Sequence, residues 1–243
     1  MQNLIENRNR KMGLRDGLPI GLGYLSVSFA FGIFGVSRGL SVIECIMISL
    51  FNLTSAGQLA AVPIIATGGS IVELALTQLI INLRYSLMSV SLSQKLGESV
   101  RLRDRFAISF ANTDEIFAVA SSKGTPVGRE YLYSLALYPI LGWTLGTTLG
   151  ALMGNILPEL IVSALGIAIY AMFIAIVVPV ASTERPVALC VLLSALLSLA
   201  VYYIPPLSSI PSGFSIIICS VIASLTFAFL KPIESGGEGA RDA

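Results

Sequence analysis

Residues 51–85 have the sequence FNLTSAGQLAAVPIIATGGSIVELALTQLIINLRY, and this stretch decides the fold. Two polar patches, Asn52–Gln58 and Asn82–Tyr85, interrupt runs that are otherwise largely apolar. A polar group in hydrocarbon costs several kcal/mol unless it is paired or faces water. Polar residues at membrane depth are therefore functional candidates by default. We expect this stretch to line a path for a small molecule through a membrane.

The composition of the chain is that of a membrane protein. It has 243 residues, of which 55% are hydrophobic and 12% are charged, whereas soluble domains average about 25% charged residues. Several uncharged gaps are as long as the roughly 20 residues that a membrane helix needs, and no alternation typical of outer-membrane strands occurs. We predict an all-α polytopic membrane protein.

Seven apolar runs are candidate membrane helices. They are residues 18–36, 42–66, 71–92, 131–153, 160–181, 187–204 and 214–230. We expect one transmembrane domain over residues 1–232. Its parts are a first half (about 12–95), a cytoplasmic link (94–130), a second half (about 131–204) and a final helix (213–231), and a disordered tail follows at 233–243.

Charge distribution leaves two topologies open. Basic residues in short loops mark the cytoplasmic side, and the segment Ser93–Arg105 is the most basic link. Seven full spans then place the N-terminus outside, which leaves its basic residues on the disfavoured side. In the alternative, residues 42–66 form a re-entrant hairpin with a tip at Ser55–Gly57, and six spans restore a cytoplasmic N-terminus.

A weak internal sequence repeat, called the echo below, favours seven helices. Ala60–Ile64 resembles Ile176–Val180, and each segment lies late in a long apolar run. Three spans, a cytoplasmic link and three further spans would be related by inversion, as in many secondary transporters. Within the link, Phe106–Ala120 is too short and too polar to span alone. We expect it to form a short helix at the interface or dipping into a cavity.

The first polar patch is the main candidate for a substrate-binding site. Its candidate residues are Asn52, Thr54, Ser55, Gly57 and Gln58. A glycine lets the backbone open, and freed carbonyl and amide groups can then meet the charged groups of a zwitterion. The competing interpretation is structural, because serine, threonine and amide side chains routinely hydrogen-bond between membrane helices.

The second patch adds Asn82 and Arg84 to the candidate site. Arg84 lies about 20 Å along its run, where a charge costs at least about 2.5–3.5 kcal/mol on insertion scales. It is a candidate for contact with a substrate carboxylate. Asp114 and Glu115 are candidate gating or proton-coupling groups, since burial raises carboxyl pKa values. A structural salt bridge to Arg84, or a solvated helix start, explains these two acids equally well.

The remaining features bound the function. Pro63 and Pro179 are expected to break or kink their helices. The chain has no histidine and three scattered cysteines, so we expect no metal site and no cofactor. No nucleotide-binding or nucleophile motif is present, so we expect neither an enzyme nor a nucleic-acid partner.

Several short motifs together resemble the AzlC family, the large subunits of bacterial branched-chain amino acid exporters. They are Arg15–Pro19, Ala30–Gly32, Ser55–Ala60, Asn82–Tyr85 and Thr113–Glu115. The resemblance covers about residues 12–232. The chain departs from the expected pattern at Leu59, where we expect an aromatic residue, and at Tyr85, where we expect histidine.

This resemblance implies a multi-pass protein of the bacterial inner membrane that exports leucine, isoleucine, valine and perhaps methionine. It also implies a small AzlD-type membrane subunit as partner, and secondary transport driven by the proton-motive force. We therefore expect alternating access around a site near the middle of the bilayer. The alternatives are an uncoupled channel or facilitator for a small solute, and a structural membrane subunit that transports nothing.

Overall fold

The structure is a computed structural model that describes residues 2–123, 126–154, 156–158 and 177–230, with the single residues 160, 164 and 174. Its helices are α1 (Gln2–Ser37), α2 (Val42–Phe51), α3 (Ser55–Ala66), α4 (Ile71–Ser93), α5 (Leu102–Phe110), α6 (Asp114–Ser121), α7 (Arg129–Met153), α9 (Arg185–Tyr203) and α10 (Ser212–Leu230). The chain divides into two compact units, unit 1 (Met1–Ala171) and unit 2 (Met172–Ala243).

An all-helical, polytopic membrane protein is confirmed for the part of the chain that the structure describes. Five of the described helices are long and apolar enough to cross a membrane, namely α1, α4, α7, α9 and α10. Their bounds agree closely with the predicted runs, except that α1 begins earlier than residue 18. Most of the predicted run 160–181, the start of the echo at Ile176 and the tail 233–243 lie outside the described residues.

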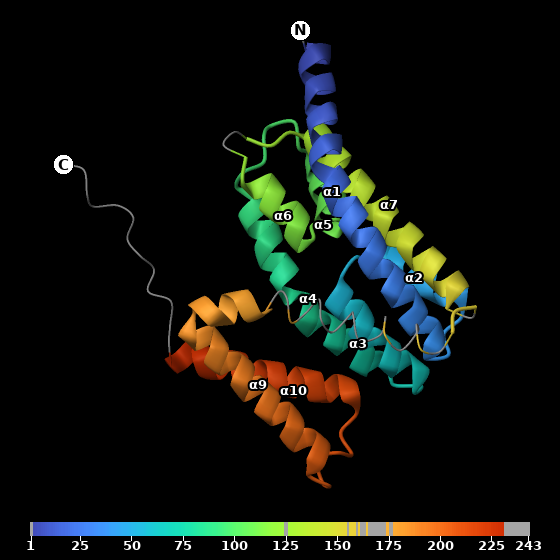
Figure 1. Cartoon of the computed structure of the whole chain (residues 1–243). Coiled ribbons are helices and arrows are strands. Elements are labelled where there is room, and N and C mark those ends of the chain that lie inside the picture. The colour runs from blue at the N-terminus through green and yellow to red at the C-terminus, as the bar shows by residue number, and fades with distance from the viewer. Residues whose placement is uncertain are drawn as a thin grey trace, which may run out of the picture. The chain divides into compact units, whose positions relative to one another are not determined.

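Helices α1 and α7 form the centre of unit 1, where they pack side by side and run parallel (Figure 1). A Cβ added to Gly142 would lie 2.1 Å from the Gly21 carbonyl oxygen, and one added to Gly150 would lie 1.9 Å from that of Phe29. Contact positions on both helices therefore increase together along the chain. The glycine face of α7 touches α1, whereas the leucines of its opposite face are exposed, where they can contact lipid tails. These are Leu137, Leu141, Leu145 and Leu149.

Because α1 and α7 are parallel, the prediction of seven full spans, with two inverted sets of three, was wrong. That topology needs α1 and α7 to be antiparallel. The glycine ladders allow the two backbones to approach closely, but they specify no direction. Helix α4 runs opposite to both, because Lys95, just after its end, accepts the N–H of Val127, just before the start of α7, at 2.9 Å. One crossing by α4 returns the chain to the side where α7 begins, so residues 42–66 must enter and leave on one side.

Residues 42–66 form a helix, a break and a second helix. Ser41 caps α2 through its hydroxyl, and Glu44 in turn accepts the Ser41 backbone N–H at 2.7 Å. The helix ends at Phe51, and Thr54 caps α3 by accepting the Gly57 N–H at 3.0 Å. We call the intervening residues 52–54 the first break. Helix α3 continues through Pro63 to Ala66, so the chain leaves helical geometry at the polar patch and not at this proline.

The predicted link, residues 94–130, contains the same arrangement. Residues 106–120, predicted as one short helix, belong to two helices, α5 and α6, separated by Ala111–Thr113. We call residues 111–113 the second break. The N–H of Arg101 donates to Asp104 at 3.0 Å at the start of α5, as Ser41 does to Glu44 at the start of α2. The low apolar content of this segment concealed a second hairpin.

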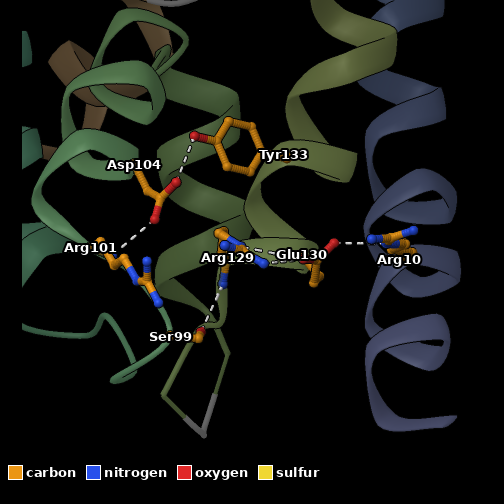
Figure 2. A network of polar contacts seen from close by, with 7 residues as sticks. All are labelled: Arg10, Ser99, Arg101, Asp104, Arg129, Glu130 and Tyr133. Carbon is orange, nitrogen blue, oxygen red and sulfur yellow. Dashed lines mark hydrogen bonds and ion pairs between the residues drawn. The ribbon is translucent and has the colours of Figure 1, made fainter. Parts of the chain in front are cut away.

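Both basic segments lie at one end of unit 1. Lys123 pairs with Asp16 at 2.7 Å, and Arg10 pairs with Glu130 at 2.7 Å. Figure 2 shows Glu130 between Arg10 and Arg129, with Tyr133 donating to Asp104 nearby. The lysines and arginines that start α1, α5 and α7, or join α4 to α5 and α6 to α7, belong to this basic end. They are Arg8, Arg10, Lys11, Arg15, Lys95, Arg101, Arg103, Arg105, Lys123 and Arg129.

Unit 2 contains the hairpin of α9 and α10. The two helices are antiparallel, and serines from both line a cavity of about 510 Å³ between them. Pro179 lies in the helical segment 177–183, where its carbonyl accepts a hydrogen bond from Ser182 at 2.7 Å. Residues 175–176 before it are outside the described residues, so the helix break predicted at Pro179 stays a prediction.

Candidate functional site

Tyr24 marks the centre of unit 1, and the two breaks meet beside it. It lies eleven residues after Gly13, which approaches Tyr131 of α7, and twelve before Val36, which approaches Gly154 just after α7. Its hydroxyl is 2.7 Å from the Thr113 hydroxyl and donates to the carboxylate of Glu115, so it touches the second break. The side chain of Leu53, from the first break, is buried in the same apolar cluster. Both breaks therefore adjoin this cluster, and the contacts of Tyr24 place the second one near the middle of α1.

The first break is held together by amide side chains. Gln58 is fully buried, and its Nε2 donates to the Asn52 carbonyl at 2.7 Å and to Ser49 Oγ at 3.1 Å. Gln78 of α4 accepts from Asn52 Nδ2 at 3.0 Å and donates to the Gly57 carbonyl at 2.8 Å. These bonds join the end of α2, the start of α3 and helix α4 around the break. This is the structural role that the sequence left open for Asn52 and Gln58.

Two buried acceptors near the first break have no hydrogen-bond partner among the described residues. They are Gln58 Oε1 and Asn82 Oδ1. Asn82 uses its Nδ2 to donate to Gln78 Oε1 at 3.2 Å, so its oxygen is directed elsewhere. Buried polar atoms without partners are rare in proteins and call for a water molecule or a ligand. An ammonium group or water can satisfy both.

The second break carries charge. Thr113 precedes α6, and Asp114 and Glu115 occupy the first helical turn, where the helix dipole favours negative groups. Arg84 of α4 pairs with Asp114 at 2.9 Å and also donates to the Tyr85 hydroxyl at 2.9 Å. The salt bridge that the sequence offered as one explanation of these acids is therefore present. It neutralises Asp114, while Glu115 contacts Tyr24.

Helix α4 connects the two breaks through neighbouring residues. The Tyr85 side chain lies near Thr54 at the first break, whereas Arg84 contacts Asp114 at the second. The first turn of α3 contains no acid, and that of α6 contains two. One helix N-terminus is thus a positive end with hydroxyl groups, and the other presents carboxylates. A small zwitterion has the complementary pair of charges.

Comparisons with known proteins identify the family. The model of the family described as AzlC protein matches residues 19–157, more than half of the chain and nearly all of α1 to α7. The chain belongs to the AzlC family. It is 30% identical over 227 residues to the inner membrane protein YgaZ of Escherichia coli, which covers 89% of this chain and 90% of the relative.

A second relative of this AzlC-family chain is an uncharacterized membrane protein of Archaeoglobus fulgidus. It is 31% identical over 143 residues, which are 59% of this chain and 62% of the relative. No solved structure matches the chain. Both relatives are named as membrane proteins, in agreement with the five long apolar helices that the structure describes in this chain.

All the residues predicted for the site of this AzlC-family protein lie at or beside the two breaks. Asn52 and Thr54 flank the first break, Ser55 starts α3, and Gly57 and Gln58 follow on the same helix. On α4, Asn82 donates to Gln78, which bonds Asn52 and the Gly57 carbonyl, and Arg84 pairs with Asp114. Their roles in substrate binding stay predictions.

The sequence interpretation missed Tyr24, Gln78 and Thr113. Gln78 lies one helical turn before Asn82, and this spacing is a signal that a polar face continues along α4. Thr113 precedes two acids, as expected of a helix cap. Tyr24 lies in a glycine-rich apolar run, and no pattern in the sequence connects it with Glu115.

Proposed function

We propose that this protein is the large subunit of a secondary transporter that exports branched-chain amino acids (leucine, isoleucine, valine and perhaps methionine) across the bacterial inner membrane. AzlC-family proteins are generally involved in amino acid transport. The observation that carries the proposal is the meeting of two broken helices near the centre of unit 1. Discontinuous helices at mid-membrane form the substrate sites of many transporters.

The orientation of the chain follows from its charges. Ten of the lysines and arginines of unit 1 belong to the basic end, whereas only Arg38 lies at the opposite end among the described residues. Positive loops face the cytoplasm, so the N-terminus and the link between α4 and α7 are cytoplasmic. Helices α2–α3 then enter from the outside and α5–α6 from the cytoplasm. Two hairpins that approach the centre from opposite sides can serve as two gates for alternating access.

The substrate in this proposal binds with its two charged groups at different breaks. Its carboxylate lies at the N-terminus of α3, where the Ser55 hydroxyl and the positive end of the helix dipole favour an anion. Its ammonium lies near Glu115 at the second break. Arg84 is paired with Asp114, so it organises the acidic side instead of binding the carboxylate directly. The apolar residues around Tyr24 contact the branched side chain.

The partner and the energy source rest on the resemblance to exporters. We expect a small AzlD-type membrane subunit to assemble with this chain and the proton-motive force to drive export. Glu115 is the candidate coupling group, because it contacts the Tyr24 hydroxyl near the middle of the membrane.

A channel or facilitator is the second candidate function. Two short helices whose positive ends face the centre of the membrane also occur in pores that exclude cations. In that case the breaks would line an open path, and no conformational cycle would be needed.

Leucine counterflow distinguishes the two. Proteoliposomes with this chain and its small partner subunit are loaded with unlabelled leucine and diluted into labelled leucine. A transporter accumulates label transiently, and Glu115→Gln reduces this accumulation. A channel equilibrates label without an overshoot, and that outcome would contradict the proposed function.

A further inference from the structure

A cavity of about 250 Å³ lies between α4 and α5, at the basic end of unit 1. Its lining combines apolar and polar side chains, among them Leu92, Leu96, Phe106, Ser89, Ser109 and Asn112. Pockets for drug-sized ligands are roughly 300–1,000 Å³. This cavity is therefore suited to a smaller molecule that has both a hydrocarbon part and a polar head.

Asn112 indicates that the cavity takes a ligand. Its side chain is only 3% exposed, and its Nδ2 donates to Ser89 Oγ at 3.1 Å. Its Oδ1 is buried and has no hydrogen-bond partner among the described residues. A buried carbonyl oxygen without a donor is unfavourable, and the missing donor can come from a molecule in the cavity.

We propose that this cavity is a cytoplasmic entry site, where the exported amino acid binds before it reaches the breaks. The inference rests on the proposed function. The ammonium donates to Asn112 Oδ1, and the Ser89 hydroxyl, which accepts from Asn112, donates its own hydrogen to the carboxylate. The hydrocarbon tail packs against Leu92, Leu96 and Phe106.

The position of the cavity fits this role. Arg105 lines it and is exposed at the basic end, where its charge attracts the carboxylate of an arriving substrate. Asn112 is also part of the second break, and the next residue, Thr113, contacts Tyr24. A molecule that leaves the cavity past Asn112 therefore meets the central site.

A lipid acyl chain is the other occupant that the apolar wall would accept. An acyl chain has no hydrogen-bond donor, so it leaves Asn112 Oδ1 without a partner. An amino acid can pack its side chain against the apolar lining and donate a hydrogen bond to Asn112 Oδ1, so the observations favour an amino acid over a lipid.

Two tryptophan variants on α5 test the entry site. Ser109 lines the cavity and Ala107 does not, and both positions are exposed. In nanodiscs, Ser109→Trp should weaken the binding of labelled leucine by about tenfold or more, whereas Ala107→Trp should leave it unchanged. Equal binding by both variants overturns the proposal. Loss of a co-purified phospholipid from Ser109→Trp, with leucine binding intact, also overturns it and assigns the cavity to lipid.

A cysteine variant keeps the test decisive if Ser109→Trp does not fold. In inside-out vesicles Ser109→Cys should react with a membrane-impermeant maleimide, and leucine should slow the reaction, with the wild type as control for its native cysteines. Labelling that leucine does not affect contradicts the entry site. If the wild type shows no leucine counterflow, both the proposed function and the entry site are contradicted. If the wild type is active and Ser109→Cys is not protected, the entry site alone is wrong.

Discussion

The two breaks share a backbone design but differ in chemistry. Each follows a short helix whose first turn holds an acid that accepts the capping N–H, Glu44 in α2 and Asp104 in α5. Each is followed by a helix that begins after a threonine. The first break is closed by the neutral amides of Gln58 and its neighbours, whereas the second carries two carboxylates, an arginine and a tyrosine. The first break therefore mainly fixes structure, and the second holds the charge available for function.

The two breaks also lie at matching positions in two similar sets of helices. A long helix followed by a helix, a break and a helix occurs in α1–α3 and again in α4–α6. Helices α1 and α4 run in opposite directions, so the two sets are inverted with respect to each other. The two sets thus have the same order of elements in opposite directions, at other boundaries than the repeat predicted from the sequence.

The largest effect is expected from the charge pair of the second break. Arg84→Leu leaves Asp114 without its partner in a region where an unpaired charge costs about 2.5–3.5 kcal/mol. Leucine transport should fall by about tenfold or more. The double variant Arg84→Leu/Asp114→Leu should recover part of this loss, and Arg103→Leu, an exposed arginine of α5, should change little. If the double variant transports leucine more slowly than either single variant, loss of the Arg84–Asp114 ion pair does not explain the effect of Arg84→Leu.

The first break should respond in stability. Gln58→Ala leaves the Asn52 carbonyl and Ser49 without their donor, and removal of such buried partners costs about 1–3 kcal/mol each. The free energy of unfolding in micelles should fall by about 3 kcal/mol. Gln94→Ala at the exposed end of α4 is the control and should stay within about 0.5 kcal/mol of wild type. A Gln58→Ala protein as stable as the control would remove the structural role of this break.

Gly57 gives a smaller effect on the same break. A Cβ at this position would lie 2.6 Å from Gln78 Oε1 and 2.7 Å from Thr54 Oγ1. Gly57→Ala must therefore displace Gln78 and should lower the unfolding free energy by about 1–2 kcal/mol. Gly23→Ala is the matched control, because nothing lies within 4 Å of its added Cβ. The control should be neutral or slightly stabilising, and destabilisation of both variants to the same extent would contradict this account.

The smallest effect is expected from the acids that start the two hairpins. Hydrogen bonds from the Ser41 N–H and hydroxyl lower the pKa of Glu44. Burial raises the pKa of Asp104, but hydrogen bonds from the Arg101 N–H and Tyr133 outweigh it and lower the pKa overall. The stabilisation by both acids is therefore present above their unfolded pKa values, near 4, and is lost as the pH falls through the lower folded values.

Glu44→Gln and Asp104→Asn should consequently lower the midpoint of thermal unfolding slightly at pH 7. The difference from wild type should shrink below about pH 4. A difference that grows as the pH falls would show that neither carboxylate is stabilised by its cap.

Residue patterns predicted the first break well and the second poorly. The cluster from Asn52 to Gln58 is conspicuous because it interrupts an apolar run, so its position in a broken helix follows from simple energetics. The second break lies in a segment too polar to resemble a membrane segment. The residues that it contacts, Tyr24 and Arg84, are distant from it in sequence, so the sequence pattern does not reveal these contacts. The direction of α7 relative to α1 was also hidden, since a glycine ladder permits close packing in either direction.

We propose that the two breaks form one site, which binds the carboxylate and the ammonium of an amino acid at separate places. Dissociation constants of leucine and of 4-methylpentanoate, which lacks the ammonium, test it most directly in wild type and in Glu115→Gln. We predict that Glu115→Gln weakens the binding of leucine by about tenfold and leaves that of 4-methylpentanoate unchanged. Equal weakening of both ligands, or of neither, would contradict the assignment of Glu115 to the ammonium and with it the account of a shared site.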